Sequence, residues 1–159
     1  MTVFTATERR AHLLAAASHG GAYGKKNLTA TIELAAQATF PHTIEFGHIP
    51  SNARIASGSK VYWDKLATAT TTLDLGLGAV DGNLVNADDP DALNVTLDVT
   101  SAGSADLLAD HANFGLPAWD LVASETTDPG GELKVYGTVQ DALTTGTGTI
   151  TVSVDYYID

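Results

Sequence analysis

The sequence contains no cysteine and has few charged side chains. The absence of cysteine excludes disulfides, thiolate nucleophiles and cysteine-ligated zinc sites. Charged residues make up 17% of the 159 residues, below the usual fraction of about 25%. Threonine, alanine and glycine take their place, which favours a β-rich chain with many tight turns. The length is that of one domain with a sizeable core.

Long hydrophobic runs are also missing. The longest clearly apolar stretch, Leu13–Ala17, falls far short of the about 20 residues that cross a bilayer. Arg9 and Arg10 precede it as in a signal peptide, but Glu8 and His12 interrupt the pattern. We therefore expect no membrane association and no signal peptide, so the chain should stay in the compartment where it is made.

Positive charge is scarce and unevenly distributed. The net charge is −11, but residues 1–65 carry seven cations against four acids, and residues 66–159 carry one cation against fifteen acids. The two parts therefore have balances of +3 and −14. A chain this acidic is not expected to bind nucleic acid, because phosphate binding needs a basic face. The asymmetry predicts that the two parts face different neighbours.

Motifs that carry catalysis or metal binding are weak or absent. The chain has no G-x-S-x-G elbow, Walker loop, H-E-x-x-H pair or Rossmann glycine fingerprint, so we do not expect an enzyme or a cofactor. The acidic segment Asp81–Asp91 offers oxygen ligands but lacks the EF-hand spacing, so a turn is favoured and a metal site stays open. His42 and His48 would lie about 20 Å apart in a strand, too far for joint ligation.

Two segments of different character divide the chain. Residues 1–27 predict an N-terminal arm, with Thr7 capping a short helix over Glu8–Ser18 and a glycine-rich basic linker after it. Residues 28–159 predict an all-β domain, a sandwich or jelly roll of about eight antiparallel strands. The expected strands are Leu28–Ala35, Thr43–Ile49, Ala53–Trp63, Thr70–Leu77, Val95–Val99, Leu116–Ala123, Glu132–Val139 and Thr147–Ile158.

Side-chain alternation predicts which faces are buried. In Thr147–Ile158 every second residue is apolar, the clearest strand pattern of the chain. In Thr43–Ile49 the pattern places Ile44, Phe46 and His48 on one face. In Val95–Val99 it places Val95, Leu97 and Val99 on one face. Within the domain, Ala105–Ala112 is the one segment expected to form a short helix.

Four segments follow one another in a recognisable order: TIEFGHIPSNARI (Thr43–Ile55), TTTLDLGLGAVDGN (Thr70–Asn83), DPDAL (Asp89–Leu93) and the C-terminal segment Gly131–Asp159. Together they resemble small virion proteins of tailed bacteriophages, especially capsid decoration (cement) proteins. The similarity spans about residues 28–159, and residues 1–27 depart from it. It implies a protein that binds the exterior of the capsid, often as a trimer, with the major capsid protein as partner. The protein would be made in the host cytoplasm and end in the virion.

On this interpretation the basic and aromatic residues take structural roles. Arg9, Arg10, Lys25 and Lys26 would meet an acidic shell surface. Trp63, Tyr156 and Tyr157 would lie at subunit contacts or in the core. The alternatives are another virion component, such as a head–tail connector, fibre base or tail protein, and a carbohydrate-binding β-sandwich that uses the sandwich face or Trp119 with Asp120. The exposure of the aromatic side chains should discriminate the carbohydrate module from the others.

Overall fold

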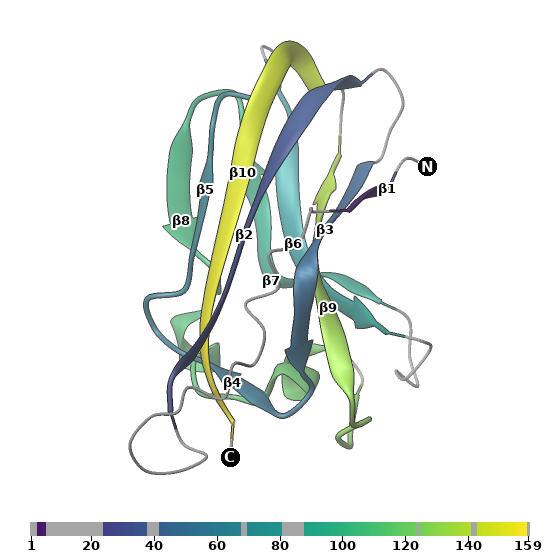
Figure 1. Ribbon diagram of the computed structural model, residues 1–159, viewed down its shortest axis with the longest axis vertical. Helices are drawn as coiled ribbons and strands as arrows, with labels where there is room; N and C mark the ends of the chain where they lie inside the picture. The colour runs from purple at the N-terminus through teal and green to yellow at the C-terminus, as the bar shows by residue number, and fades with distance from the viewer. Residues whose placement is uncertain are drawn as a thin grey trace.

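Two five-stranded β-sheets pack face to face in the computed structural model (Figure 1). The structure describes residues 3–5, 24–37, 42–67, 70–80, 88–123, 125–140 and 143–158. The predicted all-β sandwich is confirmed, with ten described strands where about eight were expected. The strands are β1 (Val3–Thr5), β2 (Lys26–Gln37), β3 (His42–Pro50), β4 (Ala53–Ile55), β5 (Lys60–Trp63), β6 (Thr72–Ala79), β7 (Asp89–Asp98), β8 (Gly103–Asp106), β9 (Glu132–Val139) and β10 (Leu143–Ile158).

Strands from distant parts of the chain alternate within each sheet. Sheet A has the order β1-β3-β9-β6-β7, and sheet B has the order β2-β10-β5-β8 with β4 also paired to β10. The short β1 runs parallel to β3. All other described pairings are antiparallel. No helix among the described residues is long and apolar enough to cross a membrane.

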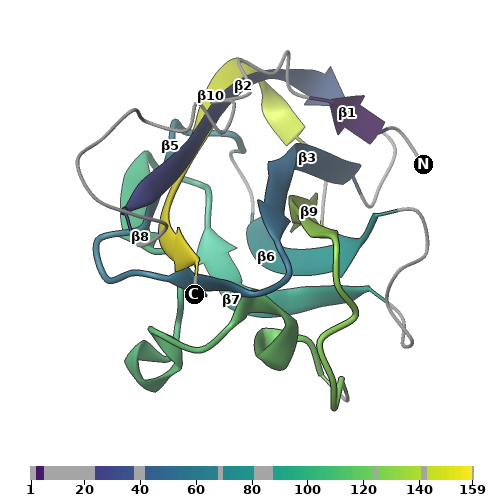
Figure 2. The same ribbon diagram turned by 60° about the horizontal axis from the view of Figure 1, so that its bottom comes forward.

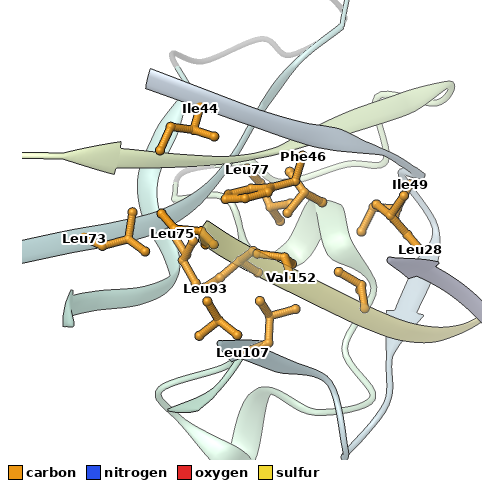
Figure 3. Close-up of a cluster of buried hydrophobic side chains, with 14 of the residues drawn as sticks. Leu28, Ile44, Phe46, Ile49, Leu73, Leu75, Leu77, Leu93, Leu107 and Val152 are labelled. Atoms are coloured by element: carbon orange, nitrogen blue, oxygen red, sulfur yellow. The ribbon is translucent and has the colours of Figure 1, made fainter. Parts of the chain in front are cut away.

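The core lies between the two sheets and follows the predicted alternation in β10. Ile150, Val152, Val154 and Tyr156 are buried there, and the residues between them point outward. Figure 3 shows Phe46, Leu75 and Leu77 of sheet A in the same cluster as Leu28 and Val152 of sheet B. Burying such side chains removes apolar surface from water at about 25 cal/mol per Å², which is the main stabilising contribution to a sandwich.

The single strand predicted over Ala53–Trp63 is wrong. The segment forms β4 and β5 with a turn between them, in which Gly58 has a φ of 101° that favours glycine. The Ser59 hydroxyl donates to the Ala56 carbonyl (2.8 Å) and accepts from the Asp155 N–H (2.9 Å). These bonds fix the turn against Asp155 in the C-terminal part of β10, between the segments of β10 that pair with β5 and with β4.

Two further secondary-structure predictions are also corrected. Ala105–Ala112 is not a helix, because its first residues complete β8 and only His111–Asn113 form a 3₁₀ turn (η1). Leu116–Ala123 is not a strand, because Ala118–Leu121 form a second 3₁₀ turn (η2) after Pro117. The Trp119 N–H donates to the Ser51 carbonyl (3.0 Å), which anchors η2 beside the β3–β4 turn.

Irregular pairing changes two predicted faces. A bulge between Glu45 and Gly47 shifts the β3–β9 register, so His48 leaves the buried face of Ile44 and Phe46. In β7 the register shifts twice against β6, and Thr96 has a φ of 56°. Val95 is therefore 42% exposed although Val99 is fully buried. The predicted helix over Glu8–Ser18 lies outside the described residues.

Candidate interaction surface

The start of β2, the strand β4 and the end of β10 meet at one end of sheet B. Lys26 pairs with Tyr156, and Arg54 pairs with Tyr157. Figure 1 and Figure 2 both place the C-terminal end of β10 beside β4, near the start of β2. Because side chains alternate along a strand, buried Tyr156 and exposed Tyr157 point to opposite sides of this sheet end.

An open hollow of about 570 Å³ lies at this sheet end. Lys25, Arg54 and Tyr157 line it together with Phe114 and Gly115, which follow η1. The hollow therefore combines two cationic side chains with two aromatic rings. We call it the Lys25–Tyr157–Arg54 hollow.

Hydrogen bonds hold both cations in place. Lys25 Nζ lies 2.6 Å from an Asp155 carboxylate oxygen, and Asn27 Nδ2 donates to the other oxygen at 2.7 Å. Arg54 Nη1 donates to the Gly115 carbonyl at 2.7 Å. The bond to Asp155 raises the pKa of Lys25. Burial disfavours the charged form of Asp155, but the bonds from Lys25 and Asn27 outweigh it and lower the pKa of that carboxyl.

The residues expected to make contacts from the sequence divide into three groups. Lys25, Lys26 and Tyr157 come together at this sheet end. Trp63 and Tyr156 are buried within the chain's own core, at 9% and 5% exposure, which leaves little of either ring to another subunit. Trp63 Nε1 donates to the Ser101 carbonyl at 2.9 Å. Arg9 and Arg10 lie outside the described residues.

Arg54 and Phe114 belong to the hollow but were not identified as site residues from the sequence. Arg54 stands in the segment NARI, which contributed only to the resemblance. Its place beside Tyr157 depends on the pairing register of β4 and β10. A turn after η1 places Phe114 in the hollow, and no strand or helix pattern in the sequence predicts that turn. No local signal could have found either residue.

The described acidic residues near β7 serve the fold. Asp88 lies 2.6 Å from Lys134 Nζ and accepts from the Ala79 N–H at 2.8 Å. Asp89 accepts from the Ala123 N–H at 2.6 Å. Hydrogen bonding with Asp89, followed by burial, raises the pKa of Asp91. Residues 81–87 of the predicted acidic loop lie outside the described part of the chain.

The histidines do not form a joint ligand set where the structure describes them. His42 is fully buried at the start of β3. His48 lies beyond the bulge, 3.0 Å from a Glu45 oxygen and 3.4 Å from a Glu132 oxygen. Within the described residues no group of three or more His, Cys, Asp and Glu side chains is arranged to hold a metal ion.

Aromatic exposure bears on the sugar-binding alternative. Trp119 packs partly buried against the core instead of standing on an open face. Among the described residues the exposed large aromatics are Tyr62 and Tyr157, at 48% and 42%. They stand on different strands of sheet B, β5 and β10. Of these two rings, Tyr157 lies in the hollow. Because Trp119 is partly buried against the core, the predicted pair Trp119 and Asp120 does not form an exposed aromatic platform.

These features define a β-sandwich with a hollow lined by basic and aromatic side chains at one end of a sheet. A comparison with solved structures finds the same fold in phage capsids. A chain of "Cyanophage Pam1 capsid asymmetric unit" matches with a TM-score of 0.57 and 20% identity, over 92% of this chain and 93% of that chain. A chain of "Capsid of Ralstonia phage GP4" matches with a TM-score of 0.59 and 18% identity, over 99% of both chains.

The sequence comparisons add no closer relative. No protein-family model matches the chain, and no curated protein sequence matches it. At identities of 20% and 18% the structural likeness establishes the shared fold.

Proposed function

We propose that this chain is a structural protein of a tailed-phage virion that binds the outside of the capsid and stabilises the lattice as a decoration (cement) protein. The observation that carries the proposal is the correspondence of the whole chain to chains of two phage capsid structures. Coverage is nearly equal in both directions, so each matched chain is about as long as this one. The likeness therefore extends over nearly the whole length of each matched chain.

The strand order supports a virion role. With the short β1 left aside and β4 and β5 counted as one strand, β2 and β10 are the first and last of eight strands, and they pair in sheet B. The second and seventh, β3 and β9, pair in sheet A. We infer that this nesting is a jelly roll, an architecture found in viral capsid domains as well as in lectins and cupins.

The fold suits a part that acts by contact and has no catalytic role. A protein that binds only the assembled lattice stabilises that lattice by mass action. On this proposal the protein bridges neighbouring copies of its partner, the major capsid protein. Bridging requires a rigid body and a docking surface. The interlocked sandwich provides the first and the basic hollow provides the second. We propose a trimer, with Arg9 and Arg10 adding contacts to an acidic shell.

Binding to capsids that lack the protein tests this function. The purified chain is mixed with undecorated capsids and, separately, with unassembled capsid protein. We expect saturable co-sedimentation with capsids only, together with a higher temperature of capsid disruption. Capsids already saturated with the protein are the control and should bind no more. Failure to bind undecorated capsids, or binding without any gain in heat resistance, would refute the cement role.

Imaging separates decoration from the other virion positions. In the native particle we expect density for this chain distributed over the capsid faces. Density confined to the portal vertex or the tail would instead identify a connector or tail component.

A further inference from the structure

We propose that the Lys25–Tyr157–Arg54 hollow is the seat for an acidic segment of the capsid shell protein. The inference rests on the proposed capsid role and names the surface that would perform it. The hollow is open to solvent, and an exposed tyrosine lies between two cations in it. A hollow, an exposed aromatic ring and two cationic side chains coincide at this place.

The register of sheet B explains the arrangement. Asp155 pairs with Asn27 and Tyr156 with Lys26, so Lys25 approaches the end of β10 from the β2 side. Arg54 pairs with Tyr157 from the β4 side. Three segments therefore place a cation, an aromatic ring and a second cation in one row. Such a row on a sheet is held by backbone pairing and changes little on binding.

The charges favour an anionic occupant at this place and disfavour it elsewhere. Two of the six Lys and Arg side chains of the described residues, Lys25 and Arg54, line the hollow, whereas Lys26 pairs with Tyr156 and so lies on the side of the sheet end away from Tyr157. Lys25 also pairs with Asp155. Lys60 and Lys134 pair with Asp106 and Asp88 elsewhere in the sandwich. On a chain of net charge −11, an acidic partner is steered toward this end by repulsion from the rest.

The chemistry of the lining specifies the occupant further. Guanidinium and ammonium groups bind carboxylates through charge-assisted hydrogen bonds. The rings of Tyr157 and Phe114 offer apolar surface beside those donors. A volume of about 570 Å³ is enough for a few side chains. We therefore expect a short segment that carries an aspartate or glutamate next to an apolar residue.

The chain supplies its own matched control for the test. Lys60 pairs with Asp106 at one sheet position, and Tyr62 stands exposed beside it on β5. This repeats the composition of Lys25, Asp155 and Tyr157 but lies outside the hollow. The double variant Lys25→Gln/Tyr157→Ser is compared with Lys60→Gln/Tyr62→Ser. Binding to undecorated capsids is measured by co-sedimentation at several salt concentrations, after circular dichroism has verified folding.

We expect the hollow variant to bind at least tenfold more weakly and with a shallower salt dependence, and the control variant to bind within about twofold of the unmodified chain. Arg54→Gln alone should also weaken binding several-fold, which keeps the test decisive if the double variant is unstable. Unmodified chain that does not bind capsids refutes the proposed function itself. Unmodified chain that binds, with hollow variants that bind equally well, overturns only the assignment of the hollow.

A second copy of this chain is the competing occupant. If the hollow variants change the oligomeric state in size-exclusion chromatography while capsid binding stays unchanged, the hollow joins copies of this chain and the shell assignment is wrong. If the oligomeric state is unchanged and capsid binding falls, the shell assignment is supported.

Discussion

The packing around Gly137 leads to a sharp prediction about stability. Gly137 lies in the middle of β9, opposite Ile44 on one side and Leu75 on the other. A Cβ atom at this position would lie 2.9 Å from Leu73 Cδ1 and 3.2 Å from Phe46 Cε2. Carbon atoms at optimal contact are about 3.5–4.0 Å apart, so Gly137→Ala must displace a leucine and a phenylalanine that are both fully buried.

The expected magnitude follows from two opposing contributions. Forcing a methyl group into a well-packed core costs about 1–3 kcal/mol. Replacing glycine by alanine in a strand recovers about 0.5–1 kcal/mol of chain entropy, and no positive φ adds strain at this position. We therefore expect a net loss of about 1–2 kcal/mol in the free energy of unfolding.

Urea unfolding followed by tryptophan fluorescence measures this loss. With a slope of about 1–3 kcal/mol per molar urea, the midpoint should fall by roughly 0.3–2 M at an unchanged slope. Gly24→Ala is the matched control, because no atom lies within 4 Å of its added Cβ, and it should stay within about 0.5 kcal/mol.

A double-mutant cycle attributes the loss to the overlap. Leu73→Ala alone should destabilise by about 2–5 kcal/mol, but in the presence of Gly137→Ala it removes the closest clash. The double variant should therefore lose at least about 1 kcal/mol less than the sum of the single losses. Strict additivity, or a Gly137→Ala variant as stable as the unmodified chain, would refute the packing described here.

Two further predictions concern β3 and β7. Burial lowers the pKa of His42, so the unfolded chain binds a proton more readily than the folded one. The contribution of neutral His42 to the free energy of unfolding should be fully present above about pH 6.5, the ordinary pKa of histidine. It should be lost as the pH falls from that value through the lower pKa of the folded state. In the His42→Gln variant the urea midpoint should depend less on pH between pH 7.5 and 5 than in the unmodified chain. An equal fall of the midpoint in both proteins would exclude His42 as the cause. Thr96 has a φ of 56°, which is costly for a β-branched side chain, so Thr96→Gly should raise the melting temperature by relieving about 1 kcal/mol. A lower melting temperature would show that Thr96 makes compensating contacts.

The strands with strong local patterns were predictable from the sequence. Glu132–Val139 has the predicted bounds, and β10 keeps its predicted inward and outward faces. Both segments alternate apolar and polar residues, and Glu132–Val139 also follows the glycine pair Gly130 and Gly131. In these segments the local preference and the tertiary environment agree, so the pattern alone was sufficient.

The irregular elements were not predictable, because non-local pairing determines them. The bulge at Glu45–Gly47 adds a residue on β3 against β9 and reverses the face of His48. The break between β4 and β5 depends on Ser59 reaching Asp155, which is distant in sequence. The alternation of residues along the sequence continues through both sites, so it gives no sign of the bulge in β3 or of the break between β4 and β5.

In the candidate site, too, the residue types were predictable from the sequence, but the strand register that brings them together was not. Lys25, Lys26 and Tyr157 could be selected as exposed basic or aromatic side chains. Their meeting with Arg54 requires the exact pairing of β10 with β2 and with β4. The same inspection left Trp63 and Tyr156 open between subunit contacts and the core, where the structure places them, because an alternating strand does not reveal which of its faces the second sheet covers.

The uneven charge of the sequence acquires a different meaning in the folded chain. Sheet B interleaves strands of the basic part with strands of the acidic part, and Lys25–Asp155 and Lys60–Asp106 pair across that division. Among the described residues the basic and acidic parts of the sequence therefore do not separate into two poles. The positive charges of the hollow, on Lys25 and Arg54, act locally, because screening limits their reach to about 8 Å at physiological salt. Charge can thus orient an approaching capsid surface, but the affinity must come from contacts at short range, which is why the exposed ring of Tyr157 should matter as much as the cations beside it.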